Sequence, residues 1–141
     1  MDPSASPACA VVLAADDPAD LARFYGALLQ QPPAVGLAEH HWRLALPGGG
    51  RLEIYRPSRT RPRPRQPGRL SLCLQRPGDA DGLAAWIRQA EGLGAALLEG
   101  PRQESFGVEA WLADPEGNRL LLLVLAPRPG STPGPAGSQA P

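Results

Sequence analysis

Apolar residues in the first third of this chain recur at the spacing of a helix that buries one face. Five large apolar side chains lie three or four positions apart: Leu21, Phe24, Tyr25, Leu28 and Leu29. Asp17 is a good N-cap, and Pro18 suits the first helical position because its missing N–H is not needed there. Pro32 and Pro33 follow and cannot continue a helix. The pattern therefore predicts one amphipathic helix that begins after Asp17.

The segments around this helix are typical of strands. The apolar stretch CAVVLA from Cys9 precedes the helix, and HWRLALPGGGRLEIYRP from His41 follows it. The second stretch indicates two strands joined by a glycine-rich turn. Between the helix and this pair, only the weak segment AVGLAE offers another strand.

The second half of the chain repeats this order. The segment RLSLCLQ reads as a strand, and Asp79 caps a helix that Gly94 ends. An apolar stripe at helical spacing runs through this helix: Leu83, Trp86, Ile87, Ala90 and Leu93. Beyond it, ALLEG and VEAWLA predict strands, and DPEGN turns the chain into a last strand, RLLLLVLA.

The two halves can be aligned residue by residue at their last strands. Placing GGGRLEIY over EGNRLLLL sets Arg51 over Arg119 and Glu53 over Leu121. A repeat of about sixty residues is too long for a solenoid unit and suits a duplicated strand–helix–strand–strand–strand module. The fold class we expect is α+β, with two tandem βαβββ modules.

The total of 141 residues fits one domain. We expect a flexible N-terminus over residues 1–8 and a single domain over residues 9–125. Within it, module one spans 9–56, an Arg/Pro linker spans 57–68 and module two spans 69–125. Residues 126–141 are rich in Pro, Gly and Ser and lack the large apolar side chains that would build a core. We therefore expect a disordered tail.

Composition narrows the function classes. The 14 basic residues, all arginine, balance 14 acidic ones, so the chain as a whole is not built to hold a polyanion. No apolar run is long enough to span a membrane, and the N-terminal stretch lacks the basic leader of a signal peptide. Cys9 and Cys73 lie far apart without the spacing of a zinc site. We expect a cytoplasmic protein.

The linker region RPSRTRPRPRQPGR, from Arg56 to Arg69, concentrates six arginines and four prolines. Stacking aromatic residues are missing from this stretch, so a nucleic-acid contact is disfavoured against a stiff, solvated linker. An interaction module that uses this arginine-rich segment stays open as an alternative function.

With DDPADLARFYGALL near its start and WLADPEGNRLLLL near its end, the duplicated module resembles the vicinal oxygen chelate superfamily. That superfamily includes glyoxalase I, extradiol dioxygenases, epimerases, and the bleomycin and fosfomycin resistance proteins. The resemblance covers residues 9–125. It implies two facing half-barrels around a cleft, and it is compatible with a homodimer.

The resemblance also implies where a metal ion would bind. Metal-dependent members hold a divalent cation with four side chains, one each from the first and last strands of both modules. The matching positions here are Ala10, Glu53, Arg69 (or its neighbour Leu70) and Leu121. Glu53 alone is a ligand type, and arginine is permanently cationic. No cofactor is therefore predicted, and a divalent metal is disfavoured.

Strand alternation sets Arg51, Glu53 and Tyr55 on one face of their strand. If PGGG is a four-residue hairpin loop, Leu44 lies opposite Glu53, and Trp42 lies opposite Tyr55. The residues expected to line a ligand-binding cleft are Trp42, Leu44, Glu53, Tyr55, Arg69, Ser71 and Leu121. Glu53 and Arg69 would pair there, since a buried carboxylate needs a partner. Glu53 as a solvated edge residue and the aromatics as core residues are the alternatives.

His40 and His41 are the only histidines, and adjacent residues of a strand point to opposite faces, so at most one faces the cleft. We predict a metal-free, glyoxalase/bleomycin-resistance-like protein that binds a small organic molecule between its modules. The alternative is a metal-dependent lyase, isomerase or dioxygenase of the glyoxalase type. In that case Glu53 is the base and also holds the metal, together with His40 or His41.

Overall fold

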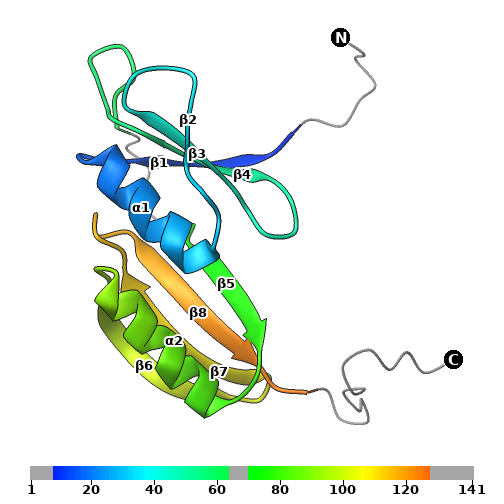
Figure 1. Cartoon of the computed structure of the whole chain (residues 1–141). Helices are drawn as coiled ribbons and strands as arrows, with labels where there is room; N and C mark the ends of the chain where they lie inside the picture. The colour runs from blue at the N-terminus through cyan, green and yellow to red at the C-terminus, as the bar shows by residue number, and fades with distance from the viewer. Residues whose placement is uncertain (1–7, 64–69, 128–141) are drawn as a thin grey trace, which may run out of the picture.

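The computed structural model describes residues 8–63 and 70–127. They form two four-stranded sheets, each with one helix (Figure 1). The elements are β1 (Ala10–Ala14), α1 (Pro18–Leu29), β2 (Ala34–Val35), β3 (His41–Ala45), β4 (Arg51–Tyr55), β5 (Leu72–Pro77), α2 (Ala80–Gly92), β6 (Ala96–Glu104), β7 (Gly107–Ala113) and β8 (Arg119–Leu125). This order confirms the predicted α+β fold of two βαβββ modules. The first seven residues, Arg69 with the end of the linker, and the tail beyond residue 127 lie outside the described residues.

The two sheets have the same topology. Their strand orders are β1-β4-β3-β2 and β5-β8-β7-β6, with the first pair of each sheet parallel and the others antiparallel. β1 and β5 are consequently edge strands, and each leaves one edge unpaired among the described strands. A cavity lined by residues of both strands lies between the modules.

Both helices begin where the capping residues predict. The Asp17 carboxylate accepts a hydrogen bond from the N–H of Asp20, and the Asp79 carboxylate accepts one from the N–H of Gly82. Each cap satisfies a backbone donor that has no partner within the first turn of its helix. Gly94, with φ at 119°, follows α2 in a conformation that favours glycine.

Two strands differ from the sequence prediction in length. β2 has only two residues, both exposed, which matches the weak signal of its segment. β6 extends from the predicted ALLEG as far as Glu104, and its register against β7 shifts after Leu97 and again after Glu99. These irregularities let the strand continue through a proline that regular pairing would exclude.

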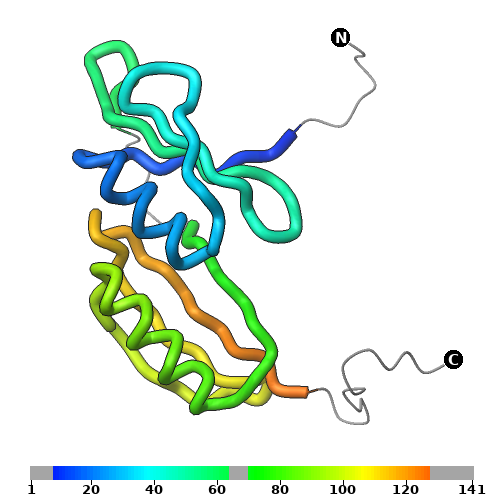
Figure 2. The backbone as a smooth tube through the Cα atoms, viewed as in Figure 1, coloured from blue at the N-terminus to red at the C-terminus, as the bar shows by residue number. Residues whose placement is uncertain are grey.

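A hydrogen-bonded contact joins the two modules. In Figures 1 and 2, α1 lies between the sheet of module one and module two. The Tyr25 hydroxyl of α1 donates to Asp114 Oδ2 at 2.7 Å, and both residues are buried. Asp114 Oδ1 also accepts the N–H groups of Glu116 and Asn118, each at 2.9 Å, which fixes the turn before β8. Burial raises the pKa of Tyr25, and the negative charge of Asp114 raises it further.

The same turn reaches the start of α1. The Glu116 carboxylate accepts hydrogen bonds from the N–H of Asp16 at 2.8 Å and of Asp17 at 3.2 Å. A negative charge here also interacts favourably with the positive end of the helix dipole. Hence the segments that carry the family resemblance, DDPADLARFY and DPEGN, bind each other across the module boundary.

We expect Tyr25→Phe to lower the free energy of unfolding by about 2 kcal/mol, because a buried carboxylate loses a hydrogen bond from a well-placed donor. Urea denaturation followed by circular dichroism measures this loss. Tyr55→Phe is the matched control, since its hydroxyl bonds to a backbone carbonyl and not to a charged group. Equal losses in the two variants would contradict the importance of the contact between modules.

Candidate functional site

The outward face of β4 carries the candidate acid. Leu52 and Ile54 are fully buried in the core, so the alternating residues Arg51, Glu53 and Tyr55 lie on the sheet face opposite to α1. This arrangement agrees with the alternation predicted from the sequence. Glu53 retains 14% of its side-chain exposure and is largely enclosed by its neighbours.

The predicted positions of Trp42 and Leu44 were wrong by one residue. β3 pairs with β4 so that Arg43 lies opposite Glu53, and His41 lies opposite Tyr55. The hairpin loop has five residues, 46–50, instead of four, and a one-residue change in register moves every side chain to the other face. Leu44 is therefore a core residue, and Trp42 lines a shallow hollow beside α1.

Glu53 is the centre of a charged cluster. Its Oε1 lies 3.2 Å from Arg43 Nε and 2.9 Å from His41 Nε2, and its Oε2 lies 3.4 Å from an Arg51 guanidinium nitrogen. Arg69 was expected to supply the opposite charge, but it lies outside the described residues. Two arginines of the same hairpin, Arg43 and Arg51, supply that charge in the structure.

His41 holds this carboxylate in place. Its Nδ1 accepts the N–H of Leu37 at 2.7 Å, so Nε2 carries the proton, and this nitrogen lies 2.9 Å from Glu53 Oε1. The ring packs against Gly36, where an added Cβ would lie 2.5 Å from Nδ1. His40, the other histidine, is exposed and has φ at 59°. Both nitrogens of His41 are engaged, which makes it a positioning residue for Glu53.

The cluster also sets the ionisation of Glu53. Desolvation by burial raises the pKa of this carboxyl, but the hydrogen bond and charge of Arg43, the charge of Arg51 and the nearby His41 together outweigh it. The net effect lowers the pKa of Glu53 below the usual 4.5. Glu53 is thus a carboxylate at neutral pH and a weak general base.

Tyr55 is covered by the first part of the arginine-rich linker. Its hydroxyl donates to the Pro62 carbonyl at 3.0 Å, and the Arg61 guanidinium lies 4.8 Å from the ring centroid. Arg63 pairs with Asp16 and fixes the loop to the end of β1. The structure therefore gives Tyr55 a role in anchoring the linker, and its hydroxyl is already used.

The cavity between the modules has a volume of about 400 Å³. Residues 11–13 of β1 and residues 70–72 at the start of β5 line it, together with Tyr25, Asn118 and Arg119. Among the predicted ligand-binding residues that the structure describes, Ser71 alone lines this cavity. Val12, also in the lining, is the cross-strand partner of Glu53. Leu121 lies one strand further in, opposite Cys73 of β5.

A family model described as the glyoxalase-like domain matches residues 10–123 of this sequence. The chain belongs to the glyoxalase-like domain family. This match, with solved structures of the glyoxalase/bleomycin resistance/dioxygenase group, confirms the resemblance seen in the sequence. No curated protein matches the chain. Within residues 8–63 and 70–127, neither helix has the length and apolar character needed to cross a membrane.

Several solved structures share the fold of this glyoxalase-like protein. A protein from Agrobacterium tumefaciens is 24% identical, with a TM-score of 0.69 over 87% of this chain and 100% of that one. A glyoxalase/bleomycin resistance protein from Albidiferax ferrireducens is 23% identical, with a TM-score of 0.61 over 82% and 96%. TnmS3, an antibiotic binding protein from Streptomyces, is 22% identical, with a TM-score of 0.62 over 86% and 98%.

The described residues of this glyoxalase-like protein do not fit a family-type metal ion. At the predicted ligand positions Ala10 and Leu121 have no donor atom, and both oxygens of Glu53 are paired with cations. In the internal repeat, Glu53 faces Val12 of β1 just as Leu121 faces Cys73 of β5. Residues 8–63 and 70–127 contain no group of three or more His, Cys, Asp or Glu side chains placed to hold a metal.

Sequence reasoning missed the arginines of the site. Arg43 and Arg51 flank Glu53 in space, and Arg119 lines the cavity. Arg51 and Arg119 occupy equivalent positions in the two modules, a signal that was present in the aligned last strands. Arg43 could be found only with the true hairpin register.

We expect Glu53→Gln to lower the free energy of unfolding at pH 7 by about 1 kcal/mol, because Arg43 and Arg51 lose their counter-ion. The lowered pKa of Glu53 determines how the free energy of unfolding depends on pH. A depressed carboxyl pKa stabilises the fold above the unfolded-state pKa, and this stabilisation disappears as pH falls through the lower folded-state pKa.

The difference between wild type and Glu53→Gln should therefore shrink below about pH 4 in urea denaturation, given the ordinary carboxyl pKa of the unfolded chain. Glu91→Gln, on the exposed side of α2, is the control and should show no such trend. A difference that stays constant from neutral to acidic pH would contradict the ion-pair model.

Proposed function

We propose that this glyoxalase-like protein binds a small organic molecule in the cleft between its modules, without a bound metal ion. The observation that carries the proposal is the state of Glu53, the single ligand-type side chain at the described family positions. Its two oxygens are neutralised by Arg43 and Arg51, and Nε2 of His41 lies 2.9 Å from Oε1. A carboxylate paired in this way stabilises β4 beside Val12 of the cleft lining and is not a vacant metal ligand.

The lining of the cavity indicates the chemistry of the ligand. Val12, Leu13 and Leu70 offer apolar surface, whereas Ser71 and Asn118 offer hydrogen-bonding groups. Arg119 is the charged residue of the lining, and its guanidinium also lies 5.8 Å from the centroid of the Trp111 ring. Such a site suits a molecule with an apolar or aromatic body and one anionic or hydrogen-bond-accepting group.

Similar proteins support a binding role. TnmS3 is an antibiotic binding protein, and the Albidiferax ferrireducens protein is a glyoxalase/bleomycin resistance protein. Both share the fold at low sequence identity, so this support is an analogy between folds and not between sites. It shows that a glyoxalase-like fold is used for holding a compound.

One observation favours the enzyme alternative, a metal-dependent lyase, isomerase or dioxygenase of the glyoxalase type. His41 and Glu53, the two residues that such a site would use, lie 2.9 Å apart. For both to bind a metal, His41 would have to lose the Nε2 proton, and Glu53 would have to leave Arg43. The metal content of the protein distinguishes the two functions.

We expect the protein, after incubation with nickel, zinc, manganese or ferrous iron and then dialysis, to retain far less than one metal equivalent. Its residual content should be the same in Glu53→Gln, because Glu53 is occupied by arginine. Inductively coupled plasma mass spectrometry measures both. One equivalent in the wild type that disappears in Glu53→Gln would establish the metal-dependent alternative.

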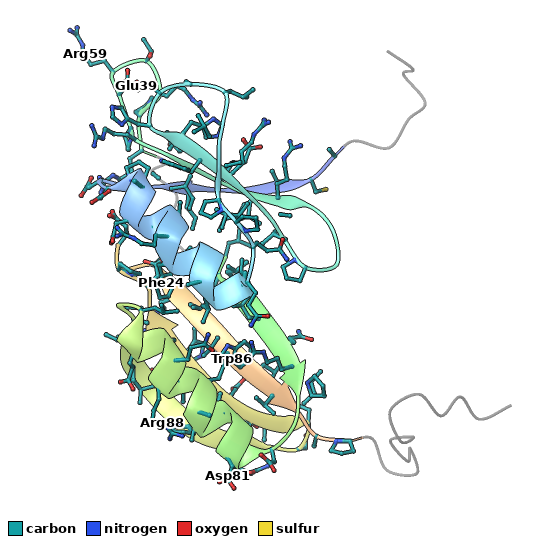
Figure 3. The ribbon with its side chains drawn as sticks, viewed as in Figure 1. Phe24, Glu39, Arg59, Asp81, Trp86 and Arg88 are labelled. Carbon is teal, nitrogen blue, oxygen red and sulfur yellow. The ribbon has the colours of Figure 1, made fainter. Side chains whose placement is uncertain are left out.

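Anilinonaphthalene sulfonate, an aromatic anion whose fluorescence rises on binding, is a suitable probe of the cleft. We expect Arg119→Gln to weaken its binding about tenfold, since a charge-assisted contact is lost. Val12→Trp, which fills the cavity, should weaken it as well. Arg88→Gln is the matched control, because Arg88 is exposed on α2 away from the cleft (Figure 3). Unchanged affinity in both cleft variants would refute the assignment of the site.

A further inference from the structure

A second cavity, larger than the cleft, also lies at the boundary between the modules. Its volume is about 640 Å³, and it is bounded by the C-terminal end of α1, the hairpin between β3 and β4, and the length of β5. We call it the β5 groove. Of the residues that line the cleft, only Leu72 also lines this groove. The two cavities are therefore separate sites that share one strand.

The walls of the β5 groove are mainly leucines. Leu28 and Leu29 come from α1, and Leu46 comes from the hairpin. Leu72 and Leu74 come from β5 and, like Leu46, pack against the core while remaining half-exposed. Such side chains still have apolar surface in contact with water. An apolar group bound in the groove would remove this surface from water, which favours binding.

Arg76 supplies the one charge of the groove lining. Its guanidinium lies 4.4 Å from the centroid of the Trp86 ring, which holds it at the wall of the groove. The ion pairs found among residues 8–63 and 70–127 leave Arg76 without a carboxylate. An anion in the groove would meet a positioned cation that has no competing partner in the described chain.

Trp86 lies beneath this cation. It belongs to α2, is 3% exposed and lies on the side of the helix that faces the strands (Figure 3). Its indole N–H is buried and has no acceptor among the described residues. Buried polar groups usually have a hydrogen-bond partner, so an acceptor that reaches this donor from the groove lined by Trp86 would be favoured.

We propose that the β5 groove is a second binding site, for a small molecule with an apolar body and a carboxylate group. The apolar body packs on the leucines, and the carboxylate pairs with Arg76 and approaches the Trp86 edge. The amide groups of Gln30, Gln31 and Gln75 at the groove complete its polar surface. This site goes beyond the proposed function, because it uses different residues and does not require that the cleft binds a ligand.

Phenylacetate and its neutral counterpart phenylacetamide test the proposal on the full chain. The three tryptophans each give an indole N–H resonance in a nitrogen-resolved NMR spectrum, and Trp86→Phe assigns one of them. Phenylacetate should shift the Trp86 resonance more than those of Trp42 and Trp111. Phenylacetamide should bind at least tenfold more weakly, because it lacks the charge that pairs with Arg76.

Variants locate the carboxylate. Arg76→Gln should weaken phenylacetate binding at least tenfold, to the level of phenylacetamide. Arg88→Gln, on the exposed side of α2, should bind phenylacetate like the wild type. Arg119→Gln should leave the phenylacetate-dependent shift of the Trp86 resonance unchanged, because Arg119 lines the cleft and not the groove. This readout separates the present proposal from that for the cleft. If Trp86→Phe does not fold, triple-resonance assignment of the wild type replaces it.

Three results would each overturn the proposal. In the first, phenylacetate leaves the Trp86 resonance in place. In the second, Arg76→Gln binds phenylacetate as well as the wild type does. In the third, sedimentation shows a dimer that Leu74→Arg separates, while phenylacetate has no effect on the wild type; this would assign the groove to a second copy of the chain.

Discussion

The arrangement of the two modules depends on a single buried carboxylate. Asp114 closes the turn before β8 by accepting two backbone N–H groups, and it also accepts the hydroxyl of Tyr25 from α1. Glu116 of the same turn binds the backbone at the start of α1. One turn therefore completes a strand pair in module two and positions the helix of module one. Tyr25 and Asn118 of this contact also line the cavity between β1 and β5.

Charged residues are distributed unevenly between the two modules. The outer face of β4 concentrates Glu53 with Arg43 and Arg51, whereas the equivalent position in module two is Leu121. The duplicated fold has thus kept its backbone symmetry while its two halves differ in chemistry. The cations that pair with Glu53 are guanidinium groups, which stay charged, so these ion pairs depend on the ionisation of Glu53.

Local signals in the sequence were sufficient to predict the two helices and the duplication of the module. Asp17 and Asp79 mark helix starts through a chemistry that acts within three residues, and apolar spacing marks the buried faces. The cluster around Glu53 could not be predicted in the same way. One extra residue in the hairpin loop turned Trp42 and Leu44 toward the core and brought Arg43 beside Glu53. The contact of Tyr25 with Asp114 joins residues 89 positions apart, which no local pattern encodes.

Two residues take part both in the contact between the modules and in the lining of the cleft. Tyr25 and Asn118 bond to Asp114, and both border the cavity between β1 and β5. A molecule bound in the cleft, as we propose, would touch the same side chains that keep the modules together. Ligand binding in the cleft and separation of the modules are then linked equilibria. If a ligand changes the free energy of module separation, separation changes the free energy of ligand binding by the same amount. Tightening of the module boundary would accompany any ligand that prefers the closed arrangement.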